Sequence, residues 1–222
     1  MATNTPRPHA LSSSLDELVT IPSPLAAERR PDLASYLQRA LQEHQQLFAQ
    51  LHGLGGAIEQ TAERIADALR RGNKLLLCGN GGSAADAEHF AAELAGRFLH
   101  DRPALAAVAL SGSGALLSCI GNDYGFEHVF ARQVAALGVP GDCLVGLSTS
   151  GRSPNVLAAM REGRTRGLTT IGLTGQREGN LLAEACDHVI AVPHTATARI
   201  QEAHGFIVHA LCGLIEIQLG HG

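Results

Sequence analysis

Apolar positions change their period along the chain. From Asp32 to Leu51 they recur every three or four residues, which predicts a helix with Asp32 as its N-cap, and a second helical period covers 57–71 before Gly72. Short apolar runs then alternate with helical stretches. Strands are predicted over 74–78, 106–110, 142–147, 169–174 and 188–192, and helices over 83–98, after Ser111, and over 127–137, 154–166, 180–184 and 198–219. This alternation predicts an α/β three-layer sandwich: a five-stranded parallel sheet with helices on both faces, preceded by N-terminal helices.

Residues 1–31 follow no such period. Pro, Ser and Thr interrupt this segment throughout. We predict a flexible N-terminal tail over 1–31 and one domain over 32–222.

The amino-acid composition indicates which classes of protein are not expected. The chain has 222 residues, of which 45% are hydrophobic and 17% charged, and its net charge is -4. Without a basic excess, a nucleic-acid-binding surface is not expected. No apolar run approaches the ~20 residues of a membrane span and the N-terminus lacks a signal-peptide pattern, so a cytoplasmic protein is expected. The five cysteines include no C-x-x-C pair, which favours buried free thiols.

Hydroxyl side chains cluster where the third predicted strand meets its helix. Ser148, Thr149, Ser150 and Ser153 surround Gly151 there. Unpaired backbone N–H groups and the helix dipole favour an anion at such a helix start. An ordinary N-cap would need only one of these hydroxyls. The cluster therefore predicts a phosphate site.

The first predicted strand runs into a second loop rich in backbone donors, Gly79-Asn80-Gly81-Gly82-Ser83. It matches neither the P-loop nor the dinucleotide fingerprint, so nucleotide binding is not indicated. A tight turn that simply needs glycine remains the alternative.

Two helices carry possible metal ligands or proton carriers. His89 and Glu93 are four residues apart and share a helix face, although such pairs are common by chance. The last helix carries Gln201, Glu202, His204 and His209, which a capping cluster with surface histidines would explain equally well. Gln201 and His209 are eight residues apart, roughly 12 Å along a helix, so they reach one point only if the helix is favourably placed or if they serve different copies of a site.

Four runs, in this order, carry a resemblance to a known family: CGNGGSAADAEHFAAELAGRF, IGNDYGFEHVF, GLSTSGRSPNVL and ARIQEAHGFIVHA. From about residue 33 to 219 the chain resembles the phosphoheptose isomerases of the sugar isomerase (SIS) domain superfamily, which have a flavodoxin-like sheet. The resemblance implies conversion of sedoheptulose 7-phosphate to D-glycero-D-manno-heptose 7-phosphate through an enediol. It also implies a homotetramer with sites at subunit interfaces and one zinc ion per subunit.

The resemblance assigns roles to residues of this chain. Glu93 and His209 match the catalytic pair, and His89, Glu93, Gln201 and His209 match the metal ligands. The matching substrate contacts are Asn80, Gly81, Gly82, Ser83, Glu93, Asn122, Asp123, Ser148, Thr149, Ser150, Ser153 and Gln201. Arg152 departs from the family, where asparagine is usual; it either contacts phosphate or, as we favour, points to solvent.

Two other functions remain open. Some SIS proteins bind a sugar phosphate without catalysis, but they lack the carboxylate and histidine that Glu93 and His209 supply. An isomerase acting on another sugar phosphate is the second alternative. The pathway that the product feeds is not determined by the sequence.

Overall fold

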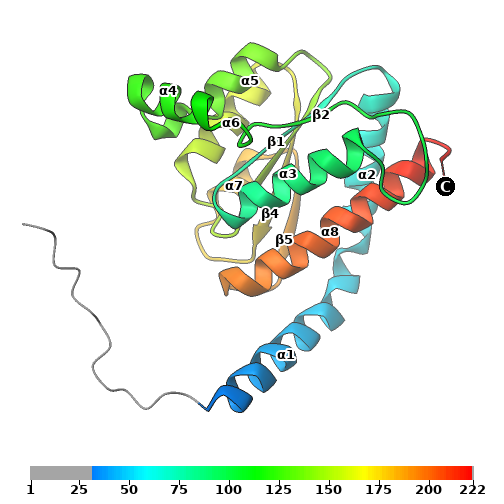
Figure 1. Cartoon of the computed structure of the whole chain (residues 1–222), viewed down its shortest axis with the longest axis vertical. Coiled ribbons are helices and arrows are strands. Elements are labelled where there is room, and N and C mark those ends of the chain that lie inside the picture. The colour runs from blue at the N-terminus through cyan, green and yellow to red at the C-terminus, as the bar shows by residue number, and fades with distance from the viewer. Residues whose placement is uncertain (1–31, 222) are drawn as a thin grey trace, which may run out of the picture. The chain divides into compact units, whose positions relative to one another are not determined.

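The computed structural model describes residues 32–221, so the predicted tail over 1–31 lies outside it. The chain divides into two units, Met1–Gln38 and Arg39–Gly222. The second unit holds the sheet and every predicted site residue (Figure 1).

Five parallel strands form one sheet in the order β2-β1-β3-β4-β5. The strands are β1 (Leu75–Gly79), β2 (Ala107–Ala109), β3 (Cys143–Ser148), β4 (Thr169–Gly175) and β5 (His188–Val192). This is the flavodoxin-like order, in which the direction of winding reverses between β1 and β3. The predicted five-stranded parallel sheet is confirmed, with each strand within a residue or two of its expected place.

The helices also follow the prediction closely. They are α1 (Leu33–Gln50), η1 (Leu51–Leu54), α2 (Gly55–Arg70), α3 (Gly82–Ala95), α4 (Gly114–Tyr124), η2 (Phe126–His128), α5 (Ala131–Leu137), α6 (Pro154–Thr165), α7 (Leu181–Ala185) and α8 (Thr197–Gln218). Two predictions need correction. The helix expected over 83–98 ends at Ala95, where Gly96 leaves the helical conformation. The one expected over 127–137 is split, because Val129 and Phe130 turn into the core between η2 and α5.

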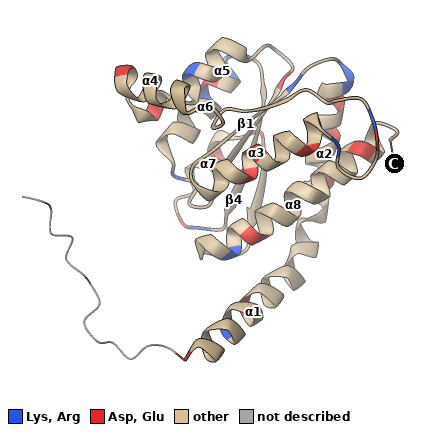
Figure 2. Cartoon of the chain, viewed as in Figure 1, with Lys and Arg blue, Asp and Glu red and all other residues tan. Residues whose placement is uncertain are grey.

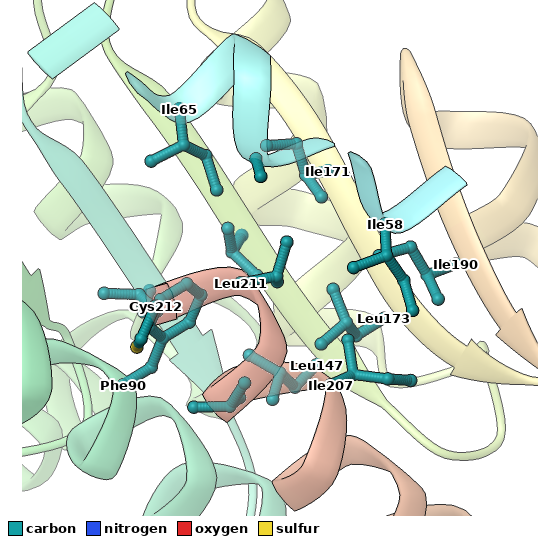
Figure 3. Packing of buried hydrophobic residues seen from close by; sticks show 14 of the residues in the cluster. Ile58, Ile65, Phe90, Leu147, Ile171, Leu173, Ile190, Ile207, Leu211 and Cys212 are labelled. Carbon is teal, nitrogen blue, oxygen red and sulfur yellow. The ribbon is translucent and has the colours of Figure 1, made fainter. Parts of the chain in front are cut away.

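Side chains of each strand alternate between two apolar layers. Leu75 and Leu77 of β1 face α2, α3 and α8, whereas Leu76 and Cys78 face the layer of α5, α6 and α7. Figure 3 shows the first layer, in which Phe90 of α3 and Leu211 of α8 pack over the strands. Burial on both faces explains why the sequences of the central strands are continuous apolar runs. On one face of the sheet, α3 and α8 pack against each other.

All five cysteines are free. Cys78, Cys143 and Cys212 are buried, Cys186 is half-buried and Cys119 is exposed. Burial is the main cause that raises the pKa of Cys143 and Cys212 to about 12, so both stay protonated at neutral pH. The expected buried free thiols are confirmed at Cys78, Cys143 and Cys212, but not at Cys119 or fully at Cys186.

Charged side chains are interspersed by sign over the helices and loops (Figure 2). None of the helices within residues 32–221 combines the length and the apolar character that a membrane span requires.

Candidate active site

The loops after β1 and β3 meet at the carboxyl edge of the sheet, where the winding direction reverses. Asn80 Nδ2 donates to Asn155 Oδ1 at 2.9 Å, and Asn155 Nδ2 donates back to Asn80 Oδ1 at 2.8 Å. Ligands bind at this point in open α/β sheets. The predicted substrate residue Asn80 therefore joins the loop after β1 to the first turn of α6. Its buried partner Asn155 was not predicted, since nothing in the sequence pairs residues 75 positions apart.

Three of the four predicted hydroxyls come together, whereas the Thr149 side chain makes no hydrogen bond among the described residues. Ser148 Oγ lies 2.9 Å from Ser153 Oγ and 3.4 Å from Ser150 Oγ, and Ser150 Oγ accepts from the Arg152 N–H at 3.2 Å. Ser153 occupies the N-cap position of α6, yet within the described chain its side chain makes no capping bond. The cluster is thus not explained by capping, and its hydroxyls converge beside the first N–H groups of a helix of 12 residues.

The segment from the end of β4 to the start of α7 is hydrogen-bonded to the loop that carries the hydroxyl cluster. Leu182 N donates to Gly151 O at 2.9 Å, and Arg152 Nε donates to Gly179 O at 3.0 Å while its terminal nitrogen donates to Glu178 O. Gly151 has a φ of 66°, and a Cβ atom there would collide with Asn180 Oδ1. Arg152 is exposed, as favoured, but it is anchored to two carbonyls rather than free in solvent.

Two glycines after β1 have different roles: Gly81 allows a tight turn, and Gly82 leaves room for a neighbouring side chain. Gly81, with a φ of 57°, immediately precedes α3. A Cβ atom at Gly82 would lie 2.6 Å from Gln201 Nε2, so a larger residue there would displace the Gln201 amide from its place against the start of α3. The hydroxyl-bearing Ser83 is buried beside it.

Three predicted metal ligands come together between α3 and α8, which lie side by side (Figure 1). His89 Nε2 is 3.1 Å from Glu93 Oε1 and 3.2 Å from His209 Nε2, and one ligand atom from each residue lies within 4.8 Å of the others. The His209 ring also stacks on Phe98, with centroids 5.4 Å apart. Two imidazole nitrogens and a carboxylate oxygen suit zinc with an open coordination position. We call these three residues the His–Glu–His cluster.

The other predicted residues lie farther out. Because Gln201 packs on Gly82, seven residues before His89, it lies roughly 10 Å along α3 from the cluster. Its role as a fourth ligand stays a prediction. Asn122 and Asp123 end the exposed helix α4, where Asn122 Nδ2 donates to Asp123 Oδ1 at 2.8 Å. Their role in substrate binding also stays a prediction.

The alternative of surface histidines on α8 is wrong for His204. Its side chain is fully buried, its Nε2 lies 3.4 Å from Thr174 O, and its Nδ1 has no partner among residues 32–221. Burial lowers the pKa of His204 to about 4. The capping part of that alternative is also wrong, because no side chain among the described residues caps the start of α8. Arg199 instead donates to Ala40 O and pairs with Glu202.

Comparisons with known proteins identify the family of this chain. The profile of the SIS domain family matches residues 35–175. Phosphoheptose isomerase of Campylobacter jejuni is 48% identical over 184 residues, which are 83% of this chain and 98% of that protein. The structure of phosphoheptose isomerase GmhA from Neisseria gonorrhoeae matches with a TM-score of 0.79 and 44% identity, over 84% of this chain and 100% of that one. The structure of a phosphoheptose isomerase from Francisella tularensis matches with a TM-score of 0.78 and 36% identity, over 84% of this chain and 99% of that one. The chain therefore belongs to the SIS domain family and, within it, to the phosphoheptose isomerases.

Proposed function

We propose that this isomerase converts sedoheptulose 7-phosphate to D-glycero-D-manno-heptose 7-phosphate. The observation that carries the proposal is the His–Glu–His cluster, because it adds a base and a proton carrier to a fold whose loops form an anion site. A sugar-phosphate-binding regulator would need the anion site but not the cluster. The relatives named above support the same reaction.

The chemistry moves one hydrogen between neighbouring carbons. In our proposal the Glu93 carboxylate removes a proton from C1 of the ketose and returns it to C2 of the enediol. His209 moves a second proton from the C1 oxygen to the C2 oxygen, so that the carbonyl group ends at C1. The hydroxyl cluster binds the phosphate at the far end of the sugar and thereby orients the reacting carbons.

The donor set of the cluster fits a divalent metal, and we propose zinc, one ion per subunit. His89, Glu93 and His209 would hold it, with Gln201 as the predicted fourth ligand. When bound, zinc supplies a Lewis acid that polarises the substrate carbonyl. The separation of Gln201 from the cluster within one chain favours its use in a neighbouring subunit's site.

We also propose a cytoplasmic homotetramer with active sites at subunit interfaces, and neither nucleic acid nor membrane as a partner. Support comes from α4 and the loop after it, where Tyr124 and Phe126 are 52% and 60% exposed next to Asn122 and Asp123. We take these two neighbouring exposed side chains as part of an apolar patch that another chain covers. Asn122 and Asp123 would then complete a neighbour's site.

A panel of sugar phosphates tests the proposed reaction. Purified protein loaded with zinc is incubated separately with sedoheptulose 7-phosphate and with ketose phosphates of five and six carbons, and the aldose products are separated by chromatography. We expect the seven-carbon substrate to have the highest kcat/KM. Faster conversion of a shorter substrate would assign the enzyme to that sugar. Tight binding of sugar phosphate without any conversion would favour the regulator.

A further inference from the structure

A buried ion pair lies beneath the His–Glu–His cluster. Arg102, in the segment between α3 and β2, donates from Nε to Glu216 Oε1 of α8 at 2.8 Å. The two side chains are 0% and 1% exposed. Neither residue belongs to the anion site or to the cluster, so the proposed chemistry leaves the pair unexplained.

Arg102 directs most of its remaining donors at the end of α3. Its terminal nitrogens donate to the carbonyl oxygens of Glu93 at 2.8 Å, Leu94 at 2.9 Å and Gly96 at 3.4 Å, and also to Pro103 O at 3.2 Å. Glu93 and Leu94 belong to the last turn of α3 and Gly96 is its C-cap, where carbonyls have no partners within the helix. One guanidinium group therefore holds the backbone of Glu93, the proposed base.

Glu216 holds the segment that follows α3. Its carboxylate accepts from the N–H groups of Phe98, Leu99 and His100 at 3.3 to 3.4 Å. Burial opposes the charge, but the hydrogen bonds from Arg102 and from the backbone outweigh it and lower the pKa of Glu216. Phe98, held in this way, stacks on the ring of His209. Glu216 also lies two helical turns beyond His209 on α8.

Stability alone is a weak reason for such a pair. Removing two charges from water costs several kcal/mol per ion, and well-packed apolar residues often replace a buried pair with equal or greater stability. Apolar residues would not reproduce the hydrogen bonds that Arg102 and Glu216 make to the backbone of Glu93 and to the segment that carries Phe98.

We infer that Arg102 and Glu216 form a positioning pair, which fixes Glu93 on α3 relative to His209 on α8 and so sets the geometry of the His–Glu–His cluster. The inference rests on the proposed roles of Glu93 and His209. Neither residue of the pair touches substrate; both act through the backbone and through Phe98.

The double variant Arg102→Met/Glu216→Leu tests this inference against a matched control. Lys74 and Asp142 form a second ion pair, 2.6 Å apart, at the amino ends of β1 and β3, in which Asp142 is fully buried and Lys74 is half-buried. Asp142 likewise accepts from backbone N–H groups, at Lys74 and Val139. The control is therefore Lys74→Met/Asp142→Leu. For each full-length protein we would measure kcat, KM for sedoheptulose 7-phosphate, affinity for Co(II) by titration, and urea unfolding.

We expect the Arg102/Glu216 variant to lose about 10- to 100-fold in kcat and in Co(II) affinity, as is usual when groups that orient metal ligands are removed. Its KM should change little, because the phosphate site lies at the other end of α3. The control variant should keep kcat and Co(II) affinity within about twofold of wild type, as expected for a structural pair distant from the cluster.

Unchanged kcat and Co(II) affinity in a folded Arg102/Glu216 variant would overturn the inference, and so would equal losses in the control. If the double variant does not fold, Arg102→Lys takes its place, since it keeps the charge but loses the planar fork of donors. Absence of turnover in wild type would instead refute the proposed function, and Co(II) affinity would then decide the inference alone.

Discussion

Glu93 is both a member of the His–Glu–His cluster and the proposed base. Its carboxylate lies 3.1 Å from His89 Nε2 and within 4.8 Å of a ring nitrogen of His209. We predict that Glu93→Gln lowers kcat at least about 1,000-fold, because an amide cannot accept the substrate proton, while the fold is kept. The matched control is Glu88→Gln, an exposed residue on the same helix that should keep full activity. Steady-state kinetics with circular dichroism tests both. More than a few per cent of activity in the Glu93 variant would remove Glu93 as the base.

His204 leads to a prediction about stability rather than catalysis. Its pKa of about 4 lies below the ordinary 6.5, so between these values the unfolded chain binds a proton that the native chain does not. Stability should therefore fall as the pH falls below 6.5, by about 2 kcal/mol at pH 5. His204→Gln cannot take up that proton and should flatten the profile, whereas His100→Gln, at an exposed site, should not. Urea unfolding between pH 7.5 and 5 distinguishes them, and parallel profiles for wild type and His204→Gln would refute the assignment.

At the scale of elements, the hydroxyl loop depends on the segment before α7. We predict that Arg152→Ala raises KM for the sugar phosphate about fivefold with kcat within about twofold. Its two hydrogen bonds to carbonyls order the phosphate site rather than the reacting carbons, and each such bond is worth ~1 kcal/mol. Arg161→Ala, at an exposed position of α6, is the control and should leave both constants unchanged. A loss confined to kcat would contradict this role.

The elements themselves were predictable because apolar periodicity reflects burial, and the three central strands β1, β3 and β4 are buried on both faces. Hydrogen bonds between residues that are far apart in the sequence were not predictable. Asn80 with Asn155, Arg152 with the carbonyls of Glu178 and Gly179, and Arg102 with Glu216 join loops to other loops or to helices whose contact depends on the folded arrangement. The position of Gln201 against Gly82 likewise depends on how α8 lies along α3. The order of residues within a short stretch of sequence does not show which distant segments become neighbours in the fold.

At the scale of the whole molecule, the proposed sharing of sites between subunits of a tetramer predicts complementation between inactive variants. Glu93→Gln lacks the base, and Asp123→Asn alters the exposed end of α4. If one site takes Glu93 from one chain and Asp123 from its neighbour, random mixing should restore roughly a quarter of the wild-type activity. The two variants are unfolded together, refolded and assayed, with light scattering to establish the tetramer. Activity no greater than the sum of the separate variants would place each site within one chain.

The most direct test of the central claim is conversion of sedoheptulose 7-phosphate in deuterium oxide, followed by proton NMR. We predict that the wild-type protein forms the aldose phosphate with deuterium at C2, because a base that exchanges with solvent returns the hydrogen to that carbon. Glu93→Gln should form none. Folded, zinc-loaded protein that gives no aldose, or a Glu93→Gln variant that gives it at the wild-type rate, would contradict the proposed reaction and its base.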